Sequence, residues 1–445
     1  MLDYDDLQLK QFLPGAKVKL SDGNVYNDND NNGSLLATVA DPLRRPQDLF
    51  KAITSPVGSP LDKLRLLPLF YTVLTRDIDE LFAMDNDEEG EGETDTLTCL
   101  RTKYKFSEEF ISSFLAPFLE GIYLSPLEEQ SSRMFHFVMK MFTVGLTSLP
   151  KGGMQAVSDQ LGRKAEGLGV EVRLGSRAVS INSLIGDNGD SRGEYLIEVD
   201  SKIDGKRNAV RAKSIIIATD FKVTRTLLQN MDNGSNLEQR RTKPLPTLPQ
   251  RSVGCIYYAF RSPAPLSDPI LVLNGEGSQN GRRNTKDFPI NNVCFPSVVH
   301  RNYAPDGYEL CSVSILENAL SGHATTTRVD GDGGDDHASL DAAVRRQLSS
   351  WFPDFAANIM DESKWVRKGV YVVNNAQPAH YGKKGDDGSL CANVHGGRDC
   401  SAFQGEAMPG GLFVCGDHMA TSTFNGALES GVNAGDAAGN FLSGL

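Results

Sequence analysis

The stretch that most constrains the fold of this chain is its last one, residues 410–445. Residues 412–415 form an apolar run bounded by glycines, which is typical of a short buried parallel strand. Residues 416–417 end that run, and residues 421–423 offer N-caps for a helix. Small residues recur on one face of this helix, namely Ala427, Gly431, Ala434, Gly435, Ala438 and Gly439. Because glycine costs a helix about 1 kcal/mol relative to alanine, these glycines indicate that another group comes close to the backbone.

A strand, a Gly-Asp pair and a following helix can together bind an anionic or electron-rich ligand. The first N–H groups of the helix and the positive end of its dipole favour negative charge. The carboxylate of Asp417 can accept hydrogen bonds from sugar-like hydroxyls. The same pattern also suits an ordinary strand–turn–helix in an α/β core, and the residues alone leave both readings open.

Two parts of this stretch carry a resemblance, Gly416-Asp417 and the run Asn-Gly-Ala-Leu-Glu-Ser-Gly at 425–431. They resemble the C-terminal FAD motif of the flavin-containing amine oxidoreductase superfamily, in its phytoene desaturase-like or carotenoid isomerase-like branch. The resemblance implies that Asp417, next to Gly416, holds the ribityl chain. It also implies that the backbone at Gly426 and Ala427 faces the isoalloxazine edge. FAD is therefore the expected cofactor.

A second region extends the resemblance. The sequence Pro-x-Gly-Gly-Met at 150–154, a helix and a run at 169–174 are similar to the segment that returns to the FAD domain in this superfamily. The resemblance implies that the backbone of Val179 contacts the adenine end of the cofactor. It also implies that the turn at Ala218 and Thr219 lies near the cofactor.

One expected element is missing from the sequence. FAD proteins of this kind open with a strand, a Gly-x-Gly-x-x-Gly turn and a helix, which cradle the pyrophosphate. No such unit occurs in the 445 residues. We therefore expect a chain that lacks its N-terminal dinucleotide-binding βαβ unit, with a truncated N-terminus and an incomplete Rossmann-like FAD domain.

The pattern of apolar residues in the rest of the sequence predicts alternating helices and strands. Apolar residues at helical spacing predict helices that start near Ser59, Ser107 and Ser131. Their Phe- and Met-rich faces are typical of plain core, and the lining of an apolar substrate site is the alternative. Strands are predicted at 170–174, 177–181, 194–199 and 210–219 as part of an open α/β sheet, and at 252–261, 270–274 and 307–316 as an antiparallel sheet.

The predicted fold class is therefore α/β, or α+β overall, in a two-domain FAD-linked oxidoreductase fold. Residues 149–230 and 405–445 are predicted to form a discontinuous FAD-binding domain. Residues 11–148 and 250–404 are predicted to form a substrate domain with a helical part and an antiparallel sheet.

Composition excludes several functions. The formal net charge of −12 argues against a broad nucleic-acid surface, which needs a basic face. Seven scattered cysteines, an odd number, do not suggest a disulfide framework. Cys391, His395 and Cys400 lack paired Cys-x-x-Cys spacing, so no metal is expected. No apolar run approaches the roughly 20 residues that span a bilayer, and no signal peptide is evident.

These observations predict an enzyme, a FAD-dependent oxidoreductase acting on an apolar, polyene-like substrate by dehydrogenation, desaturation or isomerisation, with hydride transfer to flavin N5. Two alternatives stay open, a non-catalytic remnant that acts as a binding or scaffold protein, and an amine oxidase-type enzyme. A covalent flavin link through Cys400 is disfavoured. No catalytic acid or base is assigned. Peripheral membrane contact through an apolar helix stays open, as do a plastid or cytoplasmic location, the electron acceptor and the oligomeric state.

Overall fold

A computed structural model describes most of the chain, which divides into two compact units. The described residues are 2–21, 36–40, 54–83, 94–184, 194–203, 205–232, 250–276, 278–279, 282–323, 337–378 and 411–444. Unit 1 comprises Met1–Leu81, Thr94–Gly167 and Arg251–Ala376. Unit 2 comprises Phe82–Glu93, Leu168–Gln250 and Gln377–Leu445.

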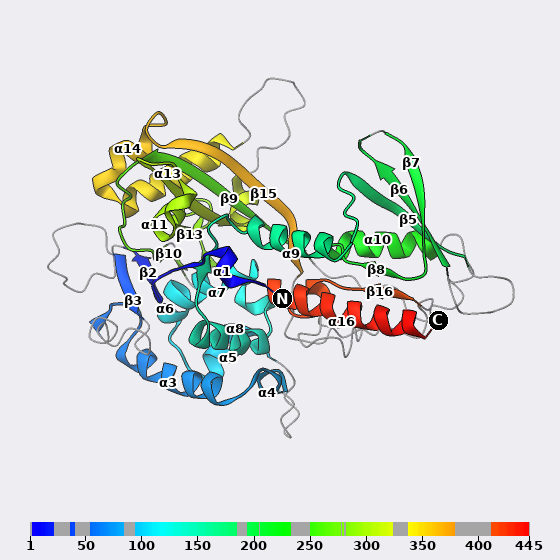
Figure 1. Ribbon diagram of the computed structural model, residues 1–445. Coiled ribbons are helices and arrows are strands. Elements are labelled where there is room, and N and C mark those ends of the chain that lie inside the picture. The colour runs from blue at the N-terminus through cyan, green and yellow to red at the C-terminus, as the bar shows by residue number, and fades with distance from the viewer. Residues whose placement is uncertain are drawn as a thin grey trace. The chain divides into compact units, whose positions relative to one another are not determined.

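Unit 1 is built on a mixed seven-stranded sheet with the order β15-β9-β14-β13-β10-β2-β3 (Figure 1). Its strands are β2 (Gly15–Leu20), β3 (Leu36–Ala40), β9 (Gln250–Arg261), β10 (Leu271–Gly275), β13 (Ile290–Cys294), β14 (Tyr308–Leu316) and β15 (Val366–Pro378). The predicted antiparallel strands are confirmed, with β14 running against β9 and β13. The sheet also contains a parallel pair, β10 with β2, which joins strands far apart in the sequence.

The core of unit 1 lies on one face of this sheet. Side chains alternate along β9, so that Ile256, Tyr258 and Phe260 are buried while their neighbours are partly exposed. Helices α13 (Ala338–Trp351) and α14 (Ala356–Met360) contribute to the same apolar cluster through residues such as Trp351 and Ile359. This burial is what makes the sheet and the two helices one layered body.

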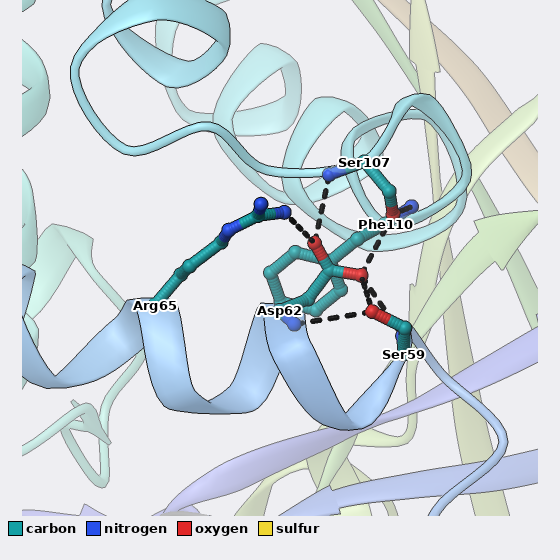
Figure 2. Close-up of polar contacts among 5 residues, drawn as sticks. All are labelled: Ser59, Asp62, Arg65, Ser107 and Phe110. Carbon is teal, nitrogen blue, oxygen red and sulfur yellow. Dashed lines mark hydrogen bonds and ion pairs between the residues drawn. The ribbon is translucent and has the colours of Figure 1, made fainter.

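Helices from residues 60–144 form a second part of unit 1. The predicted helix starts are confirmed, because Ser59, Ser107 and Ser131 each cap a helix N-terminus with the side chain. Figure 2 shows how Asp62 joins the first two of these caps. In the described part of the chain before residue 145, the helices are α1 (Tyr4–Leu7), α3 (Pro60–Thr75), α4 (Ile78–Ala83), α5 (Thr96–Thr102), α6 (Glu108–Phe110), the π-helical turn η3 (Ile111–Leu115), α7 (Ala116–Tyr123), η4 (Leu127–Glu129) and α8 (Ser132–Val144).

Short elements complete this part of the chain. They are β1 (Lys10–Gln11) with β4 (Ser148–Leu149), α9 (Gln155–Gly167), β11 (Ser278–Gln279) with β12 (Arg282–Arg283), α11 (Pro296–Val299), η5 (Arg301–Tyr303), α12 (Glu317–His323) and η6 (Pro353–Phe355). Helix α9 groups with unit 1, whereas the predicted FAD-binding domain began at residue 149.

The described residues of unit 2 form two small sheets instead of one open sheet. Strands β8 (Ile215–Ile217) and β16 (Leu412–Val414) form a parallel pair. Strands β5 (Ser176–Leu184), β6 (Glu194–Ser201) and β7 (Arg207–Ala212) form an antiparallel meander. Helices α10 (Phe221–Asp232) and α16 (Phe424–Ser443) lie along the parallel pair, with the short helix η7 (Asp417–Met419) at its end (Figure 1).

Two predictions for this region are wrong. Residues 170–174 are an exposed irregular segment and not a strand, because their alternating side chains have no sheet to pack against. The strands at 176–201 pair with each other as a meander and are not part of the parallel sheet. The overall class, a mixed α/β fold in two units, agrees with the prediction. Among the described residues, no helix is long and apolar enough to cross a membrane.

Candidate functional site

The candidate site lies where β8 and β16 end, within unit 2. The two strands pair in register from Leu412 opposite Ile215 to Val414 opposite Ile217, and Cys415 N–H donates to the Ile217 carbonyl at 2.9 Å. Because the strands are parallel, their carboxyl ends lie at the same edge of the sheet. A ligand can therefore meet residues from both strand ends.

Four of the predicted residues meet at this edge. Ala218 and Thr219 follow β8, and Gly416 and Asp417 follow β16. A Cβ placed on Gly416 would lie 3.6 Å from the Thr219 carbonyl oxygen, so the two turns are neighbours. The structure thus brings together residues about 200 positions apart in the sequence.

Gly416 occupies a position that only glycine suits. Its φ of 149° is in the region that L side chains rarely adopt, and a Cβ there would lie 2.6 Å from the His418 ring. The Gly416 N–H donates to the Ser430 hydroxyl of α16 at 2.7 Å. This hydrogen bond joins the end of β16 to α16 and fixes the direction of the backbone at Asp417.

The neighbouring side chains differ in burial. His418 is buried against the ring of Phe221, 5.5 Å between centroids. The Asp417 side chain keeps 31% of its surface exposed and lies 3.8 Å from the imidazole. The exposed carboxylate is therefore the part of this turn that a ligand can reach. Burial raises the pKa of the Cys415 thiol, which disfavours a reactive thiolate there.

The start of α16 is held by its own cap. The Thr423 side chain accepts from the Gly426 N–H at 3.0 Å, and the Thr423 carbonyl accepts from the Ala427 N–H at 3.0 Å. A Cβ on Gly426 would overlap the Thr421 carbonyl oxygen, so the loop at 420–423 packs directly on the helix. Both amides that the resemblance assigns to the flavin edge thus already have acceptors. That assignment stays a prediction.

Val179 lies elsewhere in unit 2. It is half-buried on β5, at the bulge between Ala178 and Ser180, and β5 belongs to the antiparallel meander. The strand does share an apolar cluster with β8 through Ile181 and Ile217. The predicted adenine contact of Val179 is therefore not part of the cluster at the strand ends, and it stays a prediction.

Two further polar side chains of unit 1, His300 and Tyr303, are satisfied by hydrogen bonds, and the metal candidates of the sequence lie outside the described residues. His300 accepts from Asn302 N–H at 3.3 Å as a helix cap, and the Tyr303 hydroxyl donates to the Pro150 carbonyl at 3.0 Å. Cys391, His395 and Cys400 fall outside the described residues. Within the described part of the chain, no group of three or more metal-ligating side chains occurs.

The structure shows a polar cluster that the sequence did not suggest. On the face of the unit 1 sheet away from its core, the Cys255 thiol lies 3.4 Å from the Ser312 hydroxyl. Burial raises the pKa of the Cys294 thiol and of the Tyr257 hydroxyl, each to about 12. These groups stay protonated at neutral pH, so they can donate hydrogen bonds but are poor nucleophiles. Only strand pairing brings them together, which a sequence pattern does not reveal.

An aromatic row is the other feature of note in unit 1. Phenylalanine rings follow one another through α6, η3, α7 and α8, with centroids 4.9–5.9 Å apart. The row is Phe106, Phe110, Phe114, Phe118 and Phe142. Its first two members are buried and the last three are partly exposed. Such spacing is that of stacked and edge-to-face aromatic pairs.

The fold is that of a mixed α/β protein with a ligand-accessible edge at the carboxyl ends of two parallel strands. The model of the family described as flavin containing amine oxidoreductase matches residues 44–438. The chain therefore belongs to the flavin-containing amine oxidoreductase family. It is a flavin-dependent oxidoreductase, and its cofactor is FAD.

Solved structures resemble this chain to different degrees. An oxidoreductase from Methanosarcina mazei matches with a TM-score of 0.59 and 14% identity, over 96% of this chain and 82% of that chain. A reduced UDP-galactopyranose mutase matches with a TM-score of 0.47 and 12% identity, over 84% of this chain and 74% of that chain. A comparison with curated proteins found no match.

The described residues fit FAD in part. Gly416 and the exposed carboxylate of Asp417 suit a sugar-like chain that passes the strand ends, because one leaves space and the other accepts hydrogen bonds. The capped amides of Gly426 and Ala427 would have to exchange acceptors to bind a flavin edge. No Gly-x-Gly-x-x-Gly turn is present in the sequence to hold the pyrophosphate.

Proposed function

We propose that this chain is a desaturase- or isomerase-type flavoenzyme of the phytoene desaturase-like branch, acting on an apolar, polyene-like substrate. The observation that carries the proposal is the aromatic row in unit 1. Three partly exposed rings, Phe114, Phe118 and Phe142, present a continuous apolar surface at ring-to-ring spacing. A linear conjugated chain can pack against consecutive rings by dispersion, whereas a small polar amine cannot.

In this proposal the protein orients the reactants and keeps water out. When bound, the flavin supplies the chemistry, accepting a hydride from the substrate at N5. Asp417 accepts hydrogen bonds from the hydroxyls of the cofactor chain, and Ser430 holds the Gly416 turn that positions Asp417. Desaturation also removes a proton from the adjacent carbon of the substrate, and no base is assigned among the described residues to accept it.

The polar cluster on the unit 1 sheet supports no rival chemistry. Cys294 and Tyr257 have raised pKa values and remain protonated, so a thiolate or phenolate mechanism is disfavoured at neutral pH. An amine oxidase-type reaction stays the second candidate, because the family match does not identify the substrate.

The proposal is tested with the full chain reconstituted with FAD and desalted. We expect the protein to retain a flavin spectrum. When a linear polyene in detergent is added without oxygen, the flavin absorbance should bleach or the polyene should be converted to an altered product. A primary amine should give neither signal. Phe118→Ala should weaken the polyene response about tenfold or more through lost ring contact. Phe355→Ala, in a partly buried aromatic residue outside the row, should leave the response unchanged.

Each contrary result identifies an alternative. Bleaching by amines alone would favour the amine oxidase-type reading. A well-folded chain that retains no FAD would favour the scaffold reading. An unchanged polyene response in Phe118→Ala would show that the aromatic row does not bind the substrate.

A further inference from the structure

One face of the unit 1 sheet carries two aligned rows of uncharged polar side chains. Along β13, β14 and β9, residues alternate between the buried core face and the opposite face, where they are partly exposed. Strand pairing places the partly exposed residues side by side. One row is Asn292, Ser314 and Cys255, and the other is Cys294, Ser312 and Tyr257. We call these residues the polar grid, which extends the polar cluster described above.

The polar grid is neutral and has apolar borders. Burial raises the pKa of the Tyr257 hydroxyl and of the Cys294 thiol, each to about 12, so both groups stay protonated at neutral pH. The next paired positions of β9 and β14 on this face are apolar at both ends of the grid. They are Ala259 with Leu310, and Val253 with Leu316.

The charged side chains nearest to the grid along these strands are already engaged. On β9, Arg251 forms an ion pair with Glu129, and the guanidinium of Arg261 lies over the Tyr308 ring, 5.1 Å from its centroid. Glu309 of β14 is buried on the core face of the sheet. A ligand at the grid therefore meets neutral groups from all three strands.

Two members of the grid have hydrogen-bonding groups that are open to a ligand. Within the described part of the chain, the Asn292 amide and the Ser314 hydroxyl have no hydrogen-bond partner, whereas the Ser312 hydroxyl lies 3.4 Å from the Cys255 thiol. An amide and a hydroxyl can each donate and accept. They therefore suit a neutral oxygen group, and covering them with a hydrocarbon alone would leave them unsatisfied.

Helix α7 places the aromatic row beside the grid. The Pro117 carbonyl accepts from the Asn291 amide at 3.1 Å, which joins α7 to β13. A Cβ on Gly121 of α7 would lie 3.0 Å from Asn292 Nδ2. Phe118 precedes Gly121 by three positions, so the two are neighbours on the helix surface. The aromatic row and the polar grid thus meet at Asn292.

We propose that the polar grid binds a hydroxyl or carbonyl group at one end of the apolar substrate. This inference rests on the function proposed above and adds an end group to the substrate class. The Asn292 amide and the Ser314 hydroxyl exchange hydrogen bonds with that group, while the chain packs against Phe114 and Phe118. A carboxylate end is disfavoured, because the grid offers no cation to compensate for its desolvation.

The test compares linear polyenes of equal length that end in a methyl, a hydroxymethyl or a carboxylate group. Quenching of intrinsic protein fluorescence gives the Kd of each for the full chain reconstituted with FAD. We expect the alcohol to bind about tenfold more tightly than the hydrocarbon, and the carboxylate to bind no more tightly than the hydrocarbon. Asn292→Leu/Ser314→Ala should raise the Kd of the alcohol to that of the hydrocarbon, whose own Kd should not change. Ser314→Ala alone should raise the Kd of the alcohol part of the way, and it serves if circular dichroism shows that the double variant does not fold.

A matched control makes the same changes elsewhere in unit 1. Asn302→Leu/Ser321→Ala alters exposed positions of η5 and α12 and should leave every Kd unchanged. Equal Kd values for the alcohol and the hydrocarbon in the unchanged chain would overturn this inference but not the polyene proposal. A preference for the carboxylate, or a preference for the alcohol that survives both substitutions, would also overturn it. If no polyene binds, the proposed function and this inference fail together.

Discussion

Two partly buried hydrogen bonds join Asp62 to Ser107, 45 positions later in the chain, and link two helix starts. The Asp62 carboxylate accepts from the Ser107 N–H and from the Ser107 hydroxyl, each at 2.7 Å (Figure 2). The same carboxylate accepts from the N–H of Ser59, at 2.9 Å, in the capping box of α3. One side chain thus satisfies donors at the N-termini of both α3 and α6.

Replacing Asp62 with alanine should therefore destabilise the protein strongly. Four donors from Ser59 and Ser107 would lose their acceptor, two of them backbone N–H groups. We expect a loss of about 2–4 kcal/mol in the free energy of unfolding, measured by urea denaturation. Glu166→Gln, on the exposed surface of α9, is the control and should change stability little.

Asp62 should also set part of the acid sensitivity. Burial works to raise the pKa of its carboxyl, but hydrogen bonds from Ser59 and Ser107 lower it by more, so the pKa lies below its ordinary value. A lowered pKa stabilises the fold above the unfolded value near 3.9, and this stabilisation is lost as the pH falls through the folded value. Asp62→Ala should lack this stabilisation above about pH 4, and it should therefore lose less stability than the unchanged chain as the pH falls below that value.

His136 predicts a second pH effect in a higher range. Its Nδ1 lies 2.7 Å from the Ser132 carbonyl, and its Nε2 lies 2.7 Å from the Tyr104 hydroxyl. Burial, aided by the charge of Lys103, lowers the pKa of the imidazole to about 3. The unfolded chain therefore binds a proton between about pH 6.5 and 3 that the folded chain does not, and stability falls as the pH falls through this range.

Replacing His136 should remove this pH dependence. In His136→Gln, the slope of unfolding free energy against pH should be smaller by about 1.4 kcal/mol per pH unit below pH 6. The variant should also be less stable at pH 7, because the Tyr104 hydroxyl loses its partner. Identical slopes for the variant and the unchanged chain would contradict a buried neutral imidazole.

Arg345 should be the most costly single residue to remove from the unit 1 core. Its guanidinium donates to Asp341 at 3.0 Å and to the carbonyls of Ile359 and Trp365 at 2.6 and 2.8 Å. Arg345→Met removes the nearer of the two guanidinium groups beside the buried Asp341 carboxylate, and it removes the donor to two buried carbonyls. We therefore expect a loss of about 3–5 kcal/mol in the free energy of unfolding. Arg346→Met, at the exposed neighbouring position, is the matched control in thermal unfolding. Equal losses of stability in both variants would show that removing a positive charge, and not breaking the buried ion pair, destabilises the protein.

Ser430 should affect FAD binding without touching the cofactor. Its hydroxyl accepts from Gly416 N–H at 2.7 Å and so sets the direction of the Asp417 turn. In Ser430→Ala, that N–H loses its acceptor, and we expect the Kd for FAD to rise about tenfold. Ser443→Ala, at the exposed C-terminal end of the same helix, should leave the Kd unchanged. Fluorescence quenching of FAD measures both, and an equal Kd in the two variants would exclude a positioning role.

The sequence by itself determined the local elements of this protein. Ser59 and Asp62 encode a capping box, alternation in β9 encodes a half-buried strand, and the glycine-bounded run at 412–414 encodes a parallel strand. These signals depend on neighbouring residues and on the periods of helix and strand, so they can be read without the fold. The motif at 416–431 predicted the flavin family, which the family match confirms.

Only the tertiary structure decided which elements meet. The run at 170–174 alternates like a strand, yet it stays irregular because no partner strand supplies backbone hydrogen bonds. β2 pairs in parallel with β10 about 250 positions later, and Asp62 reaches Ser107 from another helix. Local periodicity fixes the face that a side chain takes but not its partner. Partners are chosen by hydrogen bonding and packing between distant segments.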